Sequence, residues 1–107
     1  MAPDKPTYTV RDLLQRLTDQ RGEAVHLYQG EPPVFEVKRT LHRLEGPRLK
    51  AGDTYALLAI HASADELLNL QNDGMASFYH RSPESLVFHF MAFRENGHVR
   101  LEIRRLK

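Results

Sequence analysis

The stretch that decides the fold is Leu86-Val87-Phe88-His89-Phe90-Met91-Ala92-Phe93, which is apolar at every position except His89. A strand that is apolar on both faces is typical of the interior of a sheet. A turn over residues 82–85 precedes it, and Asn96-Gly97, a tight-hairpin dipeptide, follows it. We therefore predict a central strand at 86–93, flanked in sequence by strands at 75–81 and 99–104.

The first half of the chain adds a helix and three strands. Residues 9–21 place apolar side chains at helical spacing, with Thr9 as the predicted cap and Gly22 as the predicted stop. Three short runs then alternate in polarity and are separated by turns, as antiparallel strands do. These runs cover 24–29, 34–39 and 41–44.

A return to helical spacing over residues 53–72 separates the two groups of strands. We predict two short helices here. Asp53 is expected to cap the first, and Ser63 with Glu66 forms a capping box at the start of the second. The predicted order is α–βββ–αα–βββ, an α+β fold of about six mostly antiparallel strands covered by helices.

Composition narrows the function classes. The chain has 107 residues, no Cys, and a formal net charge of +1 from 15 Lys+Arg and 14 Asp+Glu. The absence of Cys excludes disulfides and thiolate chemistry, and the balanced charge gives no bulk attraction to nucleic acid. No apolar run is long enough for a membrane span. We expect a cytoplasmic protein with a flexible leader at 1–8 and a single domain at 9–107.

Several motifs carry a family resemblance. The first predicted strand contains Val25-His26-Leu27, the following turn contains Pro32-Pro33, and the last strand contains Ile103-Arg104. In these motifs and in element order, residues 9–106 resemble the N-terminal PAS-like domain of secretion ATPases. That family comprises PilT-like pilus-retraction motors and type II secretion ATPases. The retained positions are His26, Pro32 and Pro33, and the resemblance implies a PAS-like sheet-and-helix fold.

The chain also departs from that family. Glu36, Lys38 and Arg39 stand where the family has Arg, Asp and Gly, and Val87 and His89 replace two of its arginines. Arginines of this domain in the family lie near the nucleotide or a neighbouring subunit, so that role is not expected here. The sequence also lacks the Gly-x-x-x-x-Gly-Lys-(Ser/Thr) phosphate loop. We expect no enzyme activity and no cofactor.

The histidines and the basic residues are further candidate site residues. His80 and His89 are placed to face each other across a hairpin, but no third ligand is indicated, so no metal site is predicted. The basic residues gather near the third strand and at the end of the chain, where a solvated sheet surface explains them better than nucleic acid. They are Lys38, Arg39, Arg43, Arg48 and Lys50, and Arg100, Arg104, Arg105 and Lys107.

The central strand bears on function because its second face needs cover that three short helices do not obviously supply. We predict an interaction surface at Val87, His89, Met91, Phe93, Arg100 and Arg104. The alternation of β-strand side chains leaves open that the alternate set, Phe88 and Phe90, is the exposed one, or that both faces of the strand are buried in a thick core. The expected function is a non-catalytic assembly or regulatory module. Its expected partner is a protein of the pilus or secretion machinery or a second copy, giving a homo-oligomer.

Two alternatives remain open. One is a PAS-like small-ligand sensor using His26, Tyr28 or His89, which requires an internal apolar cavity. The other is an N-terminal part of a longer ATPase-like protein. The initial Met1 slightly favours a free-standing chain.

Overall fold

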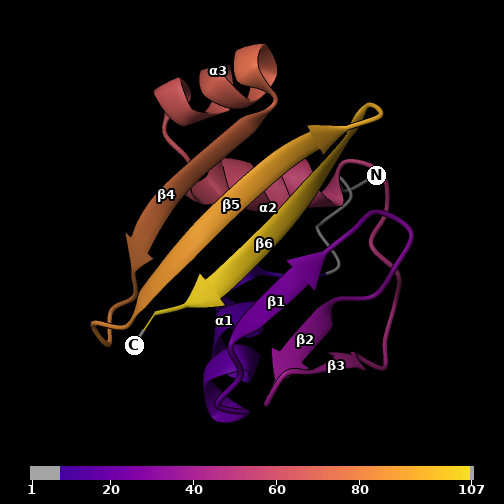
Figure 1. The fold of residues 1–107 in the computed structure, drawn as a ribbon, viewed down its shortest axis with the longest axis vertical. Helices are drawn as coiled ribbons and strands as arrows, with labels where there is room; N and C mark the ends of the chain where they lie inside the picture. The colour runs from indigo at the N-terminus through magenta and orange to yellow at the C-terminus, as the bar shows by residue number, and fades with distance from the viewer. Residues whose placement is uncertain (1–7, 107) are drawn as a thin grey trace, which may run out of the picture.

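The computed structural model describes residues 8–106, which form three helices and six strands in the predicted order (Figure 1). The α+β fold class is confirmed. The elements are α1 (Val10–Asp19), β1 (Ala24–Leu27), β2 (Val34–Val37), β3 (Thr40–Arg43), α2 (Asp53–His61), α3 (Ala64–Asp73), β4 (Met75–Arg81), β5 (Val87–Glu95) and β6 (His98–Arg105).

All six strands form one antiparallel sheet in the order β3-β2-β1-β6-β5-β4. Two antiparallel strands follow β1 directly in the sequence: β2 pairs with β1, and β3 pairs with β2. The last strand, β6, lies between β1 and β5. It therefore joins the strands β1–β3 to the strands β4 and β5 in one sheet. The apolar stretch at residues 86–93 forms most of β5, an interior strand between β6 and β4.

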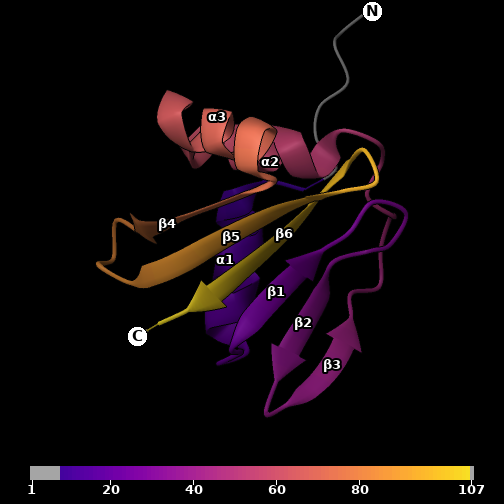
Figure 2. The ribbon, with the colours of Figure 1, turned by 45° about the horizontal axis from the view of Figure 1, so that its top comes forward.

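The helices cover one face of the sheet, and the other face carries none of them (Figures 1 and 2). Beneath the helices lies a single apolar core. From α1 it takes the stripe Leu13, Leu14 and Leu17, and from the sheet it takes alternate residues such as Phe90 and Leu101. The fold therefore has two layers, a layer of helices and a sheet, and the helices leave one face of the sheet uncovered.

Local signals explain most helix ends. The Thr9 side chain accepts a hydrogen bond from the Asp12 backbone at 3.1 Å, and the Ser63–Glu66 capping box is complete. Asp53 does not cap α2, contrary to prediction: Gly52 is the cap, and the Asp53 carboxylate accepts the Lys50 N–H at 2.7 Å. A left-handed residue, Arg21, turns the chain after α1, just before Gly22.

The predicted leader is only partly within the described residues, since residues 1–7 lie outside them. Tyr8, which we assigned to the leader, is 9% exposed and belongs to the core. Its hydroxyl donates to the carbonyl of Pro47 at 2.6 Å. Within the part of the chain that the structure describes, no helix has the length and apolar character needed to cross a membrane.

Candidate interaction surface

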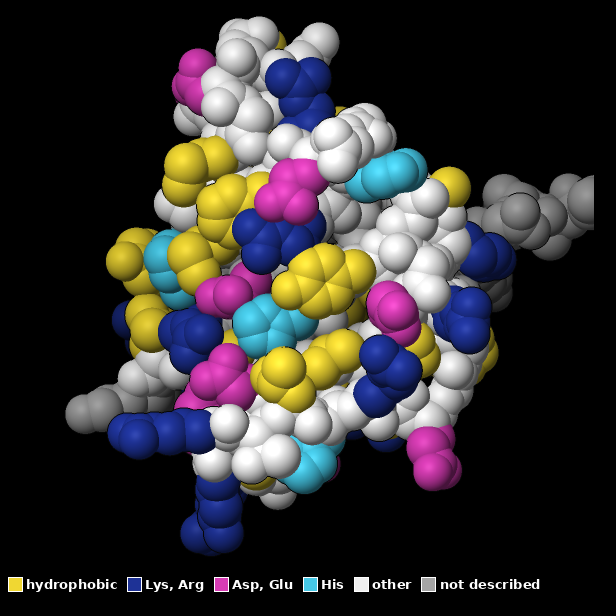
Figure 3. Space-filling view, turned by 45° about the vertical axis from the view of Figure 1, so that its right-hand side comes forward, with side chains coloured by type: hydrophobic (Ala, Val, Ile, Leu, Met, Phe, Trp, Pro, Cys, Tyr) yellow, Lys and Arg dark blue, Asp and Glu magenta, His cyan; other side chains and the backbone are white. Residues whose placement is uncertain are grey.

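The face of the sheet opposite the helices, called the open face below, carries every residue of the predicted interaction surface. In β5 the buried Phe88, Phe90 and Ala92 alternate with half-buried residues on the open face. In β6 the buried Leu101 and Ile103 alternate in the same way with the arginines. The open face therefore brings together all six predicted residues: Val87, His89, Met91, Phe93, Arg100 and Arg104. Figure 3 shows hydrophobic and histidine side chains set among charged ones on this side.

The strand register pairs these residues across β5 and β6. Phe93 lies opposite Arg100, and His89 lies opposite Arg104. The guanidinium carbon of Arg100 lies 4.6 Å from the centre of the Phe93 ring, a cation–π contact. The Tyr28 side chain, with smaller contributions from the carboxylates of Glu95 and Glu102, raises the pKa of Arg100 above its usual value. Arg100 is therefore a fixed cation resting on an aromatic ring.

His26, the family-retained histidine, lies at the centre of a charged network on the open face. Its Nε2 lies 3.3 Å from Glu36 Oε1, and its Nδ1 lies 3.3 Å from Glu102 Oε1. Arg104 Nη2 lies 3.6 Å from Glu36 Oε1 and 3.4 Å from Glu102 Oε2. The network ties β2, β1 and β6 together from the uncovered side.

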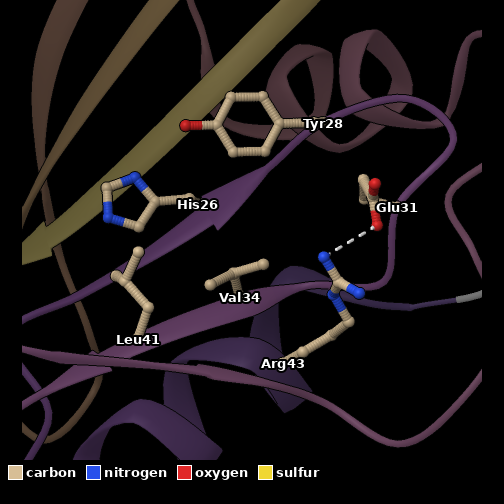
Figure 4. A pocket seen from close by; sticks show the side chains of 6 residues that line it. All are labelled: His26, Tyr28, Glu31, Val34, Leu41 and Arg43. Atoms are coloured by element: carbon tan, nitrogen blue, oxygen red, sulfur yellow. Dashed lines mark ion pairs between the residues drawn. The ribbon is translucent and has the colours of Figure 1, made fainter.

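Beside this network the open face is hollowed over β1–β3 (Figure 4). The hollow has a volume of about 480 Å³ and is open to solvent. It is lined by His26, Tyr28, Glu31, Val34, Leu41 and Arg43. Arg43 Nη2 pairs with Glu31 Oε2 at 3.4 Å, and Leu41 is 64% exposed. Sequence reasoning missed Glu31, Val34 and Leu41 here, because only the β1–β2–β3 register brings them to one place.

The predicted pairing of His80 with His89 is wrong. His89 is on the open face, where its ring stacks on Tyr79 at 4.7 Å between centroids. His80 points to the opposite face and meets His61 of α2 at 4.6 Å. Adjacent residues of a strand point to opposite faces, and the register sets Tyr79, not His80, opposite His89. Residues 8–106 contain no group of three His, Asp or Glu side chains suited to a metal.

The basic residues do not form a continuous cationic surface. Arg100 and Arg104 are each within 3.6 Å of a carboxylate, and Arg105 Nε donates to the Gly22 carbonyl at 2.9 Å. The group near β3 is exposed, and Arg43 in it is paired. Lys107 lies outside the described residues. The open face thus carries aromatic side chains, and carboxylates neutralise the charge of its arginines. Because nucleic-acid binding depends on free cationic charge, this favours a protein contact over nucleic acid.

Comparison with solved structures identifies the fold. The chain superposes on the pilus retraction motor PilT, solved with bound ADP, with a TM-score of 0.85 and 22% identity, over 94% of this chain and 29% of that one. The ATPase DotB of Legionella pneumophila matches with a TM-score of 0.77 and 18% identity, over 98% of this chain and 31% of that one. DotB of Yersinia pseudotuberculosis matches with a TM-score of 0.67 and 14% identity, over 98% and 32%.

The fold is therefore that of the N-terminal domain of the secretion ATPases, as the resemblance implied. The chain spans about a third of the length of these proteins. No family model matches the sequence. No curated protein matches it either.

Proposed function

We propose that the protein is a non-catalytic assembly module of a pilus or secretion system, acting in the cytoplasm. It docks onto a protein of that machinery through the open face of its sheet. The observation that carries this proposal is that the helices cover one sheet face only, while the uncovered face collects six residues predicted as an interaction surface. The likeness of the fold to the pilus retraction motor PilT and the ATPase DotB supports the pilus or secretion part of the proposal.

The chemistry of the open face supports docking. Protein interfaces are enriched in aromatic residues, Met and Arg, with apolar anchors inside a polar rim. Here Met91 and Phe93 supply apolar area, and the Arg100 guanidinium already lies over the Phe93 ring. Around them the charges are paired within the face, so a partner can cover it without stranding a lone charge.

Docking is preferred over ligand sensing because of the shape of the hollow at His26 and Tyr28. A small-molecule site usually encloses most of its ligand. The hollow at β1–β3 is a surface depression open to solvent. The absence of a phosphate loop from the sequence supports the non-catalytic part of the proposal.

Site-specific photo-crosslinking tests the proposal in cells that carry the gene. A photo-reactive amino acid replaces Phe93 on the open face or, as the matched control, Ile60 on α2, which is 65% exposed. We expect position 93 to crosslink a pilus or secretion ATPase, or another component of that machinery, identified by mass spectrometry, and position 60 not to do so. Equal yields at the two positions, or no such protein at position 93, would contradict docking through the open face.

A pair of charge insertions provides the binding measurement. Phe93→Asp places a carboxylate on the open face, opposite Arg100, whereas Ile60→Asp places one on the helical side. With the crosslinked protein as the titrant, we expect Phe93→Asp to weaken binding at least about tenfold, the effect typical of an interface anchor. Ile60→Asp should bind as the unchanged chain does, and unchanged circular dichroism confirms that both variants are folded.

A further inference from the structure

The outer edge of the sheet at β4 has the features of a pairing edge. β4 is the last strand in the order, and no strand of the described residues pairs with its outer side. α3 lies at the beginning of β4 (Figure 1). An unpaired edge presents a row of free N–H and C=O groups to any strand that approaches it.

The backbone groups that point outward from β4 can be identified from its pairing with β5. The Arg94 N–H donates to the Gly74 carbonyl at 2.9 Å, and the Ser82 N–H donates to the Leu86 carbonyl at 2.8 Å. Since hydrogen-bonded positions alternate along an antiparallel pair, the even-numbered residues of β4 point their backbone groups toward β5. The odd-numbered residues therefore point theirs outward. These are Met75, Ser77, Tyr79 and Arg81.

Nothing in β4 blocks this edge in the ways that natural edge strands usually are blocked. Its sequence has no Pro, Gly or Lys, and its register with β5 runs without a bulge from Met75 to Arg81. The opposite edge is different. β3 is only four residues long and follows directly on a tight turn at Lys38 and Arg39. Of the two edges, β4 is the one that is long and regular enough to pair.

The charges at the two ends of β4 indicate which strand would pair with its outer edge. Asp73 precedes the strand and Arg81 ends it, and neither has an ion-pair partner within residues 8–106. In an antiparallel pair with a second copy, each Arg81 approaches the Asp73 end of the other strand. The same ends would meet as like charges in a parallel pair. Charge complementarity thus favours an isologous antiparallel contact.

We propose that β4 pairs antiparallel with β4 of a second copy of this chain. Centring the pair on Phe78 sets Met75 opposite Arg81 and Ser77 opposite Tyr79, which engages all four outward-facing residues of each strand. The exposed side chains of Met75 and Tyr79, 49% and 68% exposed, gain cover from the other copy. The two sheets become one, with both sets of helices on the same side and both open faces on the other.

Light scattering on the full chain tests the association over about 5–500 μM, because a weak dimer forms by mass action. We expect the mean mass to rise from 12.4 kDa toward twice that value. A mass of 12.4 kDa at every concentration would overturn the proposal.

A charge-reversal cycle tests the antiparallel geometry. Asp73→Lys alone and Arg81→Glu alone each place like charges at both ends of the pair. We expect each variant to weaken dimerisation about fivefold, because like charges on neighbouring strands destabilise a strand pair. The double variant Asp73→Lys/Arg81→Glu restores opposite charges and should restore the affinity. Single variants that associate normally, or a double variant as weak as the singles, would overturn the antiparallel pair.

Crosslinking tests which edge is used, because the chain has no natural Cys. Ser77→Cys places a thiol on the β4 edge, and Thr40→Cys places the matched control on the β3 edge, both at exposed positions. A short bis-maleimide should link two copies through position 77 and not through position 40. Equal linkage at both positions would overturn the proposal. So would an association that Phe93→Asp abolishes and the charge variants leave intact, because that association would run through the open face.

Discussion

At the scale of single residues, His61 shows how the helical layer responds to pH. It ends α2, and its ring lies 4.6 Å from that of His80 and 5.8 Å from that of Phe90. Burial, and then the proximity of His80, lowers the pKa of His61 below its usual value of 6.5. The folded protein therefore favours the neutral form of the His61 imidazole.

A pH-dependent stability follows from His61. The unfolded chain takes up the His61 proton at a higher pH than the folded chain, so it binds more protons as the pH falls below about 6.5. We expect the free energy of unfolding, measured by urea titration, to fall between pH 7.5 and pH 5.5. His61→Gln should reduce this pH dependence, whereas His98→Gln, at an exposed hairpin position, should leave it unchanged. The same pH dependence in all three proteins would contradict the assignment to His61.

At the scale of elements, the β2–β3 hairpin carries local strain. Val37 and Thr40 are paired, so the turn has two residues, Lys38 and Arg39, with φ angles of 53° and 66°. Turns of this kind favour Asn-Gly or Asp-Gly because both residues need positive φ. The secretion ATPase family, which this sequence resembles, has Gly at the position of Arg39. What holds Lys38 here is its N–H, which donates to both carboxylate oxygens of Glu23 at 3.0 Å.

Relief of that strain is measurable. We expect Arg39→Gly to raise the free energy of unfolding by about 1 kcal/mol, the cost of a left-handed conformation for a residue other than Gly. Thr40→Gly is the control, because Thr40 lies in β3, where Gly should lower stability by about 0.5–1 kcal/mol. Urea titration measures both variants. A destabilised Arg39→Gly variant would mean that the Arg39 side chain contributes more than its backbone costs.

At the scale of the whole molecule, the two faces of the sheet differ in cover although β5 is apolar on both. Phe90 is 0% exposed beneath the helices, where it stacks on Phe78 at 5.0 Å. Phe93 is half-buried on the open face, in contact with Arg100. The helices are too few to cover both faces, so one aromatic set became core and the other became surface.

The difference between the faces predicts two unequal truncations. Phe90→Ala should cost about 3–5 kcal/mol of unfolding free energy, because it opens a cavity in a packed core. Phe93→Ala should cost about 1 kcal/mol, as expected for a half-buried position. Denaturant titration compares them directly. Equal costs would show that Phe93 is also core, which would remove the main anchor of the proposed docking surface.

The sequence predicted the elements well, for reasons that are local. Thr9 and Ser63 signal helix starts through their own next few residues, and Asn96-Gly97 signals a hairpin in the same way. Two of the wrong predictions have different causes. The Lys50 N–H, only three residues before Asp53, holds the Asp53 carboxylate, so Asp53 does not cap α2. The carbonyl of Pro47, distant in the sequence, holds Tyr8 in the core.

By itself, therefore, the sequence determined which segments are helices and strands and which residues share a strand face, because spacing and alternation follow from backbone geometry alone. Alternation placed Val87, Met91 and Phe93 on one face of β5 and Phe88 and Phe90 on the other, but it did not decide which face the helices cover. Only the tertiary structure decided that β6 lies between β1 and β5, that His80 meets His61 and not His89, that the hollow forms across β1–β3, and that no strand of residues 8–106 pairs with the outer side of β4. These outcomes depend on which distant segments become neighbours, and that choice is made by the burial of the whole core.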